Sequence, residues 1–235
     1  MSAIAGFDSS GNMTATSIVT NAVTATSIVT NVTNGGSVST SNVKVGPSAG
    51  ASITAGTNNV CVGPNAGNAI AAGTNNVCVG PNAGSAITAG TNNVCVGPNA
   101  GDAITSGSNN TLCGNNAGGK VSGSTGITAI GSGAGENVTS GSANTMCGLN
   151  AGRDVSTGSN NTLVGQSACT LITSANNTTA IGMNAGLSTT GSFNTYVGTA
   201  AGQNVTTGTT NTISGSGAGA TLTTGSSNVL IGGGA

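Results

Sequence analysis

Hydrophobic and polar residues alternate in a short block that recurs along most of the chain. Each block reads Val or Thr, then a variable residue, a mostly apolar residue and a glycine, as in the segment Val60-Cys61-Val62-Gly63. We number this closing glycine as position 0 and count along the chain from it. Alternation over a few residues is typical of a short β-strand with one face turned to a core. The pattern therefore predicts a strand at positions −3 to −1, with −3 and −1 facing inward and −2 facing outward.

The closing glycine recurs with a nearly constant spacing, which is the strongest signal in the sequence. Successive glycines are 17 residues apart, except for one step of 16 residues between Gly182 and Gly198. The eleven residues TNNVCVGPNAG occur unchanged three times, beginning at Thr57, Thr74 and Thr91. A fixed period of this kind indicates a solenoid of stacked units. The glycines that mark the array are Gly46, Gly63, Gly80, Gly97, Gly114, Gly131, Gly148, Gly165, Gly182, Gly198, Gly215 and Gly232.

Each repeat also carries a second apolar position and two turn segments. Position +7 is Ile, Val or Leu in most coils, as at Ile70 and Ile87, and segments rich in Gly and Asn follow both apolar blocks. Gly and Asn favour tight turns. The sequence thus predicts an all-β fold, a parallel β-solenoid or β-roll of about eleven 17-residue coils over residues 41–235. We expect two short strands and two turns in each coil, with equivalent strands about 4.8 Å apart.

Two positions predict structural ladders that run along the solenoid. Asn occupies position −4 in ten coils, and stacked Asn side chains can hydrogen-bond from coil to coil. Glycine at position 0 suits a positive φ and a close approach of neighbouring coils. At position +4 the glycine series is interrupted once, by Cys169, where we expect a local distortion. The predicted ladder residues are Asn59, Asn76, Asn93 and Asn110, and Gly63, Gly80, Gly97 and Gly114.

Five of the six cysteines fall on strand positions of the repeat. Cys61, Cys78 and Cys95 occupy position −2 in three adjacent coils, so we expect them to face outward. A spacing of about 4.8 Å lies inside the Cα separation that disulfides allow. The sequence therefore allows two alternatives for these cysteines. They form a disulfide within this column or to another chain, or they remain free thiols. Cys113 and Cys147, at position −1 and two coils apart, are expected to face inward as small core residues.

The composition argues against catalysis and against several classes of partner. Charged residues make up 3% of the chain, and His is absent. Without His no candidate nucleophile has an obvious general base, so we expect no enzymatic activity, no cofactor and no metal. A net charge of −1 offers no footprint for nucleic acid. No apolar run reaches the roughly 20 residues of a membrane-spanning helix, so we expect no membrane insertion.

The few charged side chains are weak candidates for a site. Asp102 and Glu136 both occupy position +5 and are two coils apart, about 9.6 Å at the expected spacing. Arg153 and Asp154 are adjacent in the chain, and we expect them to act as solubilising surface residues.

Residues 1–40 differ from the array and predict a separate β-rich arm. The segment MTATSIVTNA at residues 13–22 is followed at once by VTATSIVTNV at residues 23–32, a ten-residue duplication rich in β-branched residues. Such residues favour strands. We expect the arm to pair with an open end of a neighbouring solenoid. The first residues lack the basic and apolar regions of a secretory signal peptide.

The segments NNVCVGPNAGSAITAGTNN and SNNTLVGQSA are representative of the repeats over residues 41–235. They resemble the N-S-V-A-I-G repeats in the head domains of trimeric autotransporter adhesins, and related Gly/Asn/Thr repeats occur in phage and giant-virus fibres. The period of 17 is slightly longer than is typical of them. The resemblance implies a left-handed β-roll that assembles as a parallel trimer in a surface fibre.

We therefore predict a self-assembling structural protein, a homo-oligomer that builds a surface fibre or filament, extracellular or in a virion. Ordering a coil of 17 residues costs more than its narrow interior offsets, which predicts that further copies cover its outer surface. A trimer, extended head to tail into a filament or not, is the expected arrangement. One alternative is the receptor-binding or adhesive head of a fibre. Another is an ice-binding solenoid, because Thr or Ser recurs at position +8, as at Thr54 and Thr88.

Overall fold

The structure, a computed structural model, describes residues 6–7, 13–14 and 42–235 of the chain. Strands β1 (Gly6–Phe7) and β2 (Met13–Thr14) form an antiparallel pair in which Gly6 lies opposite Thr14. The remainder of the predicted N-terminal arm, including nearly all of the ten-residue duplication, lies outside the described residues. Residues 42–235 belong to a second compact unit.

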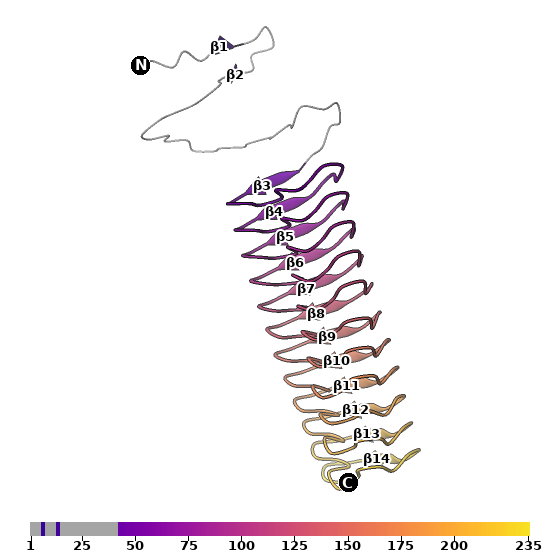
Figure 1. Cartoon of the computed structure of the whole chain (residues 1–235). Helices are drawn as coiled ribbons and strands as arrows, with labels where there is room; N and C mark the ends of the chain where they lie inside the picture. The colour runs from indigo at the N-terminus through magenta and orange to yellow at the C-terminus, as the bar shows by residue number, and fades with distance from the viewer. Residues whose placement is uncertain (1–5, 8–12, 15–41) are drawn as a thin grey trace. The chain divides into compact units, whose positions relative to one another are not determined.

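Residues 42–235 form a parallel solenoid that contributes one three-residue strand per coil to a sheet of twelve strands (Figure 1). Neighbouring strands pair in register, so that Cys78 lies between Cys61 and Cys95 of the adjoining strands. The predicted parallel β-solenoid of about eleven coils is confirmed. The strands are β3 (Val43–Val45), β4 (Val60–Val62), β5 (Val77–Val79), β6 (Val94–Val96), β7 (Thr111–Cys113), β8 (Thr128–Ile130), β9 (Thr145–Cys147), β10 (Thr162–Val164), β11 (Thr179–Ile181), β12 (Thr195–Val197), β13 (Thr212–Ser214) and β14 (Val229–Ile231).

The second strand predicted around position +7 is wrong, because that part of each coil is a run of turns. In the coil of β4, the Ile70 N–H donates to the carbonyl of Gly67 at 3.2 Å, a hydrogen bond across a single turn. Asn65 and Gly67 both adopt left-handed backbone angles, with φ of 57° and 56°, which an extended strand does not contain. The segment still bonds to the next coil, since the Gly67 N–H donates to the Ala83 carbonyl at 2.9 Å.

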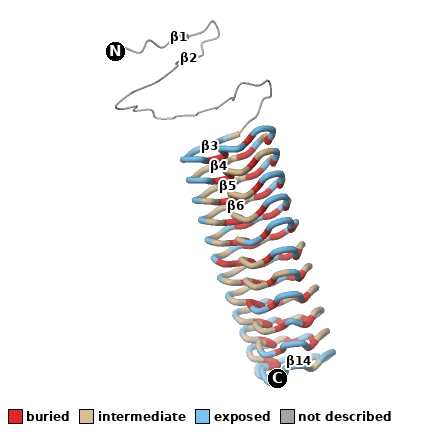
Figure 2. The backbone as a smooth tube through the Cα atoms, viewed as in Figure 1, coloured by how far each residue is buried: buried red, intermediate tan, exposed pale blue. Residues whose placement is uncertain are grey.

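The strand side chains also face the opposite way from our prediction. From β4 to β13 the side chain at position −2 is completely buried, whereas those at −3 and −1 are partly or fully exposed. Figure 2 shows how these buried positions recur from coil to coil. The glycine at +4 leaves the space that the inward residue fills: a Cβ built on Gly67 would lie 2.6 Å from the Cys61 sulfur. Cys61, Cys78 and Cys95 are therefore a buried column.

A small interior side chain in one coil is matched by a larger one in a neighbouring coil, so that the buried volume stays filled. One coil has only Ala180 at position −2 and Thr189 at +7, so its interior holds little side-chain volume. Tyr196 of the next coil and Cys169 of the preceding coil fill this space. Their ring Cδ2 and sulfur atoms lie 2.5 and 2.9 Å from the place of a Cβ on Gly186. The Tyr196 hydroxyl also hydrogen-bonds to the Thr189 hydroxyl at 3.1 Å, so the buried ring keeps a partner for its polar atom.

Cys169 does not distort its coil, contrary to our prediction. Its φ of 48° is close to the 54–66° of the glycines at position +4, and its N–H donates to the Ala185 carbonyl of the next coil at 3.0 Å. A left-handed backbone is unfavourable for a residue with a side chain. Packing of the buried thiol against the small residues of the following coil offsets this penalty.

The Asn residues at position −4 form a buried ladder that links each coil to its neighbours by hydrogen bonds. The Asn93 Nδ2 donates to the Asn76 Oδ1 at 3.1 Å and to the Gly107 carbonyl at 2.8 Å. Its Oδ1 accepts from the backbone N–H of Asn110 at 3.1 Å. The same pattern runs through Asn59 and is interrupted where other residues stand at −4, as at Ile127. Throughout the described residues every buried side-chain nitrogen or oxygen has a hydrogen-bond partner.

Glycines at position 0 allow the coils to stack closely at the end of each strand. Gly80 has a φ of +125°, and a Cβ at this position would lie 2.8 Å from the carbonyl carbon of Gly97. Gly63, Gly97 and Gly114 make the same approach to the next coil, with φ between +123° and +139°. A side chain here would meet backbone atoms, which cannot move aside without separating the coils.

We predict that Asn93→Ala destabilises the solenoid by about 2–4 kcal/mol, because it leaves the Gly107 carbonyl and the Asn110 N–H buried without a partner. Urea unfolding followed by circular dichroism measures the change. Asn92→Gly is the matched control: Asn92 is exposed with φ +58°, and loss of its amide should cost less than about 1 kcal/mol. Equal losses from both substitutions would contradict a structural role for the buried ladder.

We predict that Gly80→Ala lowers stability by more than about 2 kcal/mol, because Ala is strained at this φ and its Cβ meets the Gly97 backbone. Gly119→Ala is the control, since φ at Gly119 is not in the left-handed region and a Cβ there meets nothing closer than 3.5 Å. Thermal unfolding of the two variants should separate them clearly. A neutral Gly80→Ala would show that the coils are stacked less closely than described.

Candidate functional site

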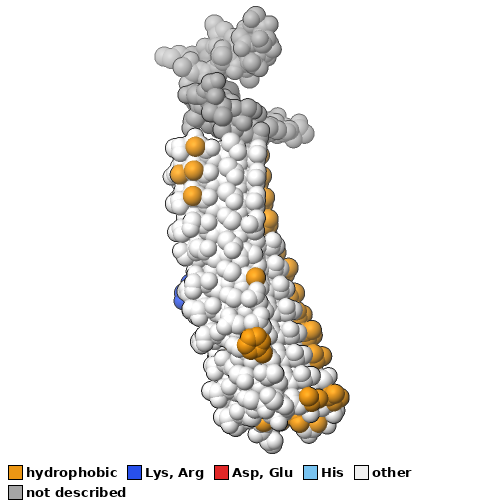
Figure 3. Space-filling view, turned by 90° about the vertical axis from the view of Figure 1, so that its right-hand side faces the viewer, with side chains coloured by type: hydrophobic (Ala, Val, Ile, Leu, Met, Phe, Trp, Pro, Cys, Tyr) orange, Lys and Arg blue, Asp and Glu red, His pale blue; other side chains and the backbone are white. Residues whose placement is uncertain are grey.

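The outward side chains of the strands form an uncharged strip, which we call the sheet face and define by positions −3, −1 and +1 of the coils. Its central column at −1 is apolar, whereas −3 is Val or Thr and +1 mixes Pro, Leu and Met with small polar residues. Figure 3 shows a row of hydrophobic side chains that follows one edge of the solenoid. Position −1 is apolar in every coil except that of Ser214. Its most exposed members are Val45 at 55%, Ile130 at 43%, Ile181 at 42%, Val197 at 38% and Ile231 at 72%.

The sheet face is uncharged and long. No Asp, Glu, Lys or Arg occupies −3, −1 or +1 in any coil, and position +1 adds Pro in the first four coils and Leu149 and Met183 later. Twelve strands about 4.8 Å apart give a strip about 53 Å long and about 10 Å wide, on the order of 500 Å². The apolar column at −1 runs along nearly the whole of this strip, and contiguous apolar surface on a protein is often an interaction site.

The buried cysteine column carries no reactive thiol. All six cysteines of the chain are free, and Cys61, Cys78 and Cys95 are fully buried. The hydrogen bond to Cys78, together with burial, raises the pKa of the Cys61 thiol far above its usual range, and burial does the same to the pKa of Cys169. All four of these thiols are completely buried and lie out of reach of a second chain. A disulfide between neighbours within the column stays a prediction.

Cys113 and Cys147 lie on the sheet face, so our expectation that they face inward is wrong. Cys113 is exposed and Cys147 is half-buried, two strands further along the sheet. They belong to the same column as Val96 and Ile130. The two cysteine side chains are therefore part of the sheet face.

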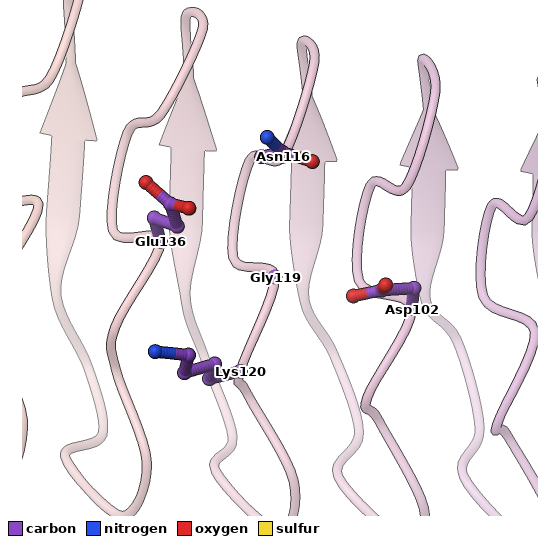
Figure 4. A pocket seen from close by; sticks show the side chains of 5 residues that line it. All are labelled: Asp102, Asn116, Gly119, Lys120 and Glu136. Carbon is purple, nitrogen blue, oxygen red and sulfur yellow. The ribbon is translucent and has the colours of Figure 1, made fainter.

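The second feature is a hollow on the turn segments of three consecutive coils (Figure 4). It has a volume of about 180 Å³ and is lined by Asp102, Asn116, Gly119, Lys120 and Glu136. The two acids that the repeat aligned at position +5 thus line one hollow, from coils two apart. The coil between them has Gly119 at +5, and the missing side chain leaves the space open.

The charged groups of the hollow do not neutralise one another by direct contact. In the part of the chain that the structure describes, the one ion pair joins Arg153 and Asp154 at 3.0 Å. The hydrogen bond from Arg153 lowers the pKa of Asp154, whereas burial raises the pKa of Asp102. Lys120 makes no ion pair with Asp102 or Glu136 within 4.0 Å. The hollow therefore offers carboxylates, an ammonium group and an amide to polar groups of a ligand.

Metal binding and membrane insertion each require a specific geometry. Within residues 6–7, 13–14 and 42–235, no three His, Cys, Asp or Glu side chains are placed to share a metal ion. Over the same residues, no helix is long and apolar enough to cross a membrane.

The Thr column at position +8 is exposed, but many of its hydroxyls hold neighbouring coils together. The Thr88 hydroxyl donates to the Thr105 carbonyl at 3.1 Å, and Thr139 donates to the Ser156 carbonyl at the same distance. These bonds give the column a structural role. Ice binding by this column stays a prediction.

No protein-family model matches the chain, and neither the curated proteins nor the solved structures compared with it give a match. The resemblance to adhesin heads and viral fibres therefore rests on the repeats alone. The fold and its surfaces are what support any function.

We predict that thiol reagents separate the six cysteines into classes in the native protein. Where the sheet face is uncovered, Cys113 should react fast and Cys147 more slowly, whereas Cys61, Cys78, Cys95 and Cys169 should react only after unfolding, because their sulfurs are buried within the coil. Labelling followed by peptide mass spectrometry measures each site. Fast labelling of Cys78 would contradict the inward orientation of position −2, and unfolded protein provides the control in which all six react.

Proposed function

We propose that this protein is a structural rod that assembles side by side with further copies of itself through the sheet face. The observation that supports this most is an uncharged strip with a central apolar column at position −1, which runs along the twelve strands on the outside of a solenoid whose interior is already filled. The strip contributes nothing to the coil interior, which is filled by positions −4, −2, +3 and +7. Its apolar character therefore favours a role as an interface that another molecule covers.

A second copy fits this strip better than an unrelated partner. Side chains recur along the sheet face every 4.8 Å or so, at the strand spacing. A partner that interdigitates along the whole length must carry side chains at the same spacing, and another copy of the chain does. The absence of charge from the face removes like-charge repulsion between identical surfaces.

We propose three copies around a common axis. The strip of about 500 Å² is smaller than the roughly 800 Å² per partner that stable pairwise interfaces bury. Around a threefold axis each strip contacts two neighbours, and residues that flank it become buried as well. This arrangement supports a fibre at an extracellular surface or in a virion, in line with the repeats of adhesin heads and viral fibres that the sequence resembles.

The test compares two double variants in the same two coils. Ile130→Lys with Ile181→Lys places charges on the sheet face, at side chains that are already exposed, and should convert the oligomer to a monomer of 21.7 kDa. Thr139→Lys with Thr190→Lys places the same charges at the exposed +8 column and should leave the oligomer intact. Light scattering coupled to size exclusion gives the masses, and circular dichroism checks the fold.

Two outcomes would contradict the proposal. One is a wild-type protein that is a monomer at micromolar concentration. The other is an oligomer that the sheet-face variant leaves unchanged, which would place the interface elsewhere. Electron microscopy of the wild type then distinguishes a short rod of defined length from a filament of indefinite length.

A further inference from the structure

The hollow beside Gly119 adjoins the end of a second ladder of Asn side chains, on the outside of the solenoid. At position +2 each Asn donates its Nδ2 to the Oδ1 of the next, at 3.2, 3.1 and 3.2 Å. This outer ladder consists of Asn65, Asn82, Asn99 and Asn116. The next coil has Gly133 at +2, so the amide N–H groups of Asn116 find no acceptor within the described residues.

The far side of this gap presents a hydrogen-bond acceptor. Asn150 occupies position +2 in the coil after Gly133, and its Oδ1 lies where a side chain on Gly133 would begin. Its amide makes no hydrogen bond to another described side chain or backbone group. One amide group is therefore missing between a donor on Asn116 and an acceptor on Asn150. Glu136 lies beside the same gap, with its Oε2 3.8 Å from the place of a Cβ on Gly133.

The fold does not require the glycine that opens the hollow. The φ of Gly119 is outside the left-handed region, and a Cβ built on it has its nearest neighbour, the Asn116 carbonyl oxygen, at 3.5 Å. Most other glycines of the array are enforced by a positive φ or by a close backbone contact. Gly119 keeps open a space that the solenoid could fill at little cost.

We infer that this hollow binds an N-acetylated amino sugar. The acetamido group supplies one donor and one acceptor, and it would complete the outer ladder between Asn116 and Asn150. Sugar hydroxyls would donate to the carboxylates of Asp102 and Glu136 and accept from the Lys120 ammonium, which makes charge-assisted hydrogen bonds. A volume of about 180 Å³ is below the roughly 300–1,000 Å³ of drug-sized clefts and suits a single sugar unit.

This binding function goes beyond the structural one and is compatible with it. In Figure 3 the Lys and Arg atoms appear at the edge opposite the row of hydrophobic side chains. Asp102, Lys120 and Glu136 occupy positions +5 and +6, outside the sheet face, whereas Asn116 at +2 lies next to it. Assembly and ligand binding can be measured on the same sample, so the failure of one proposal is distinguishable from the failure of the other.

The test titrates the full chain with methyl N-acetyl-β-glucosaminide and, in parallel, with methyl β-glucoside, which lacks the acetamido group. Chemical-shift changes in two-dimensional NMR or ligand-observed saturation transfer report binding. We expect the N-acetylated sugar to bind at least tenfold more tightly than the glucoside. No binding of the N-acetylated sugar, or equal binding of both sugars, would overturn the inference.

Two substitutions at the same repeat position show whether the ladder gap is responsible. Gly133→Asn restores the missing amide at a backbone angle, φ +67°, that the other Asn residues at +2 already adopt, and should weaken sugar binding at least tenfold. Gly217→Asn makes the same change at φ +65° in a coil that has no charged side chain, and should leave binding unchanged. Gly119→Gln, which fills the hollow, should also abolish binding. Binding of the Gly133→Asn protein at the wild-type level would contradict the assignment.

Discussion

Close stacking of one coil upon the next is the constraint on which the rest of this structure depends. Gly80 and its equivalents place backbone against backbone, so any side chain at position 0 would separate the coils. Once the coils are that close, the Asn side chains at −4 can reach the backbone of both neighbours, as Asn93 does. The interior then needs only small or medium side chains to be full. Regular hydrogen bonds and tight contact, rather than a large apolar core, hold the solenoid together.

The period of the sequence predicts the architecture because stacking makes each coil repeat the last. The direction of the side chains is harder to predict, because position −3 is Val or Thr and position −1 is mostly apolar, which reads as a buried face. The residue at −4 is the signal that decides the direction. Asn93 must be inside to bond both neighbours, and alternate residues of an extended segment share a side. Position −2 therefore faces inward, and the β-branched residues that looked like core form the sheet face.

The buried volume is set by neighbouring coils together, which a single repeat does not reveal. Ala180 and Thr189 leave space that Tyr196 and Cys169 fill from the coils on either side. Met146 does the same for the preceding coil, which has Ala129 at −2. Its Cε lies 2.7 Å from the place that a Cβ on Gly135 would take. The distortion expected at Cys169 is absent because the loss of a glycine is matched by the loss of volume next to it.

Because neighbouring coils compensate for one another, some departures from the repeat have a structural reason and others do not. Cys169 and Tyr196 are departures whose physical reason is found inside the coil. Gly119 and Gly133 are of the other kind: both lie outside the coil interior, neither is matched by a neighbouring change, and together they open a hollow and break a ladder. Five of the seven charged residues, Asp102, Lys120, Glu136, Arg153 and Asp154, lie in four consecutive coils around these two glycines. Gly217 and the exposed Phe193 are also departures that the interior does not explain, but around Gly119 and Gly133 such departures coincide with charged side chains and an open hollow, which is the combination that a binding site needs.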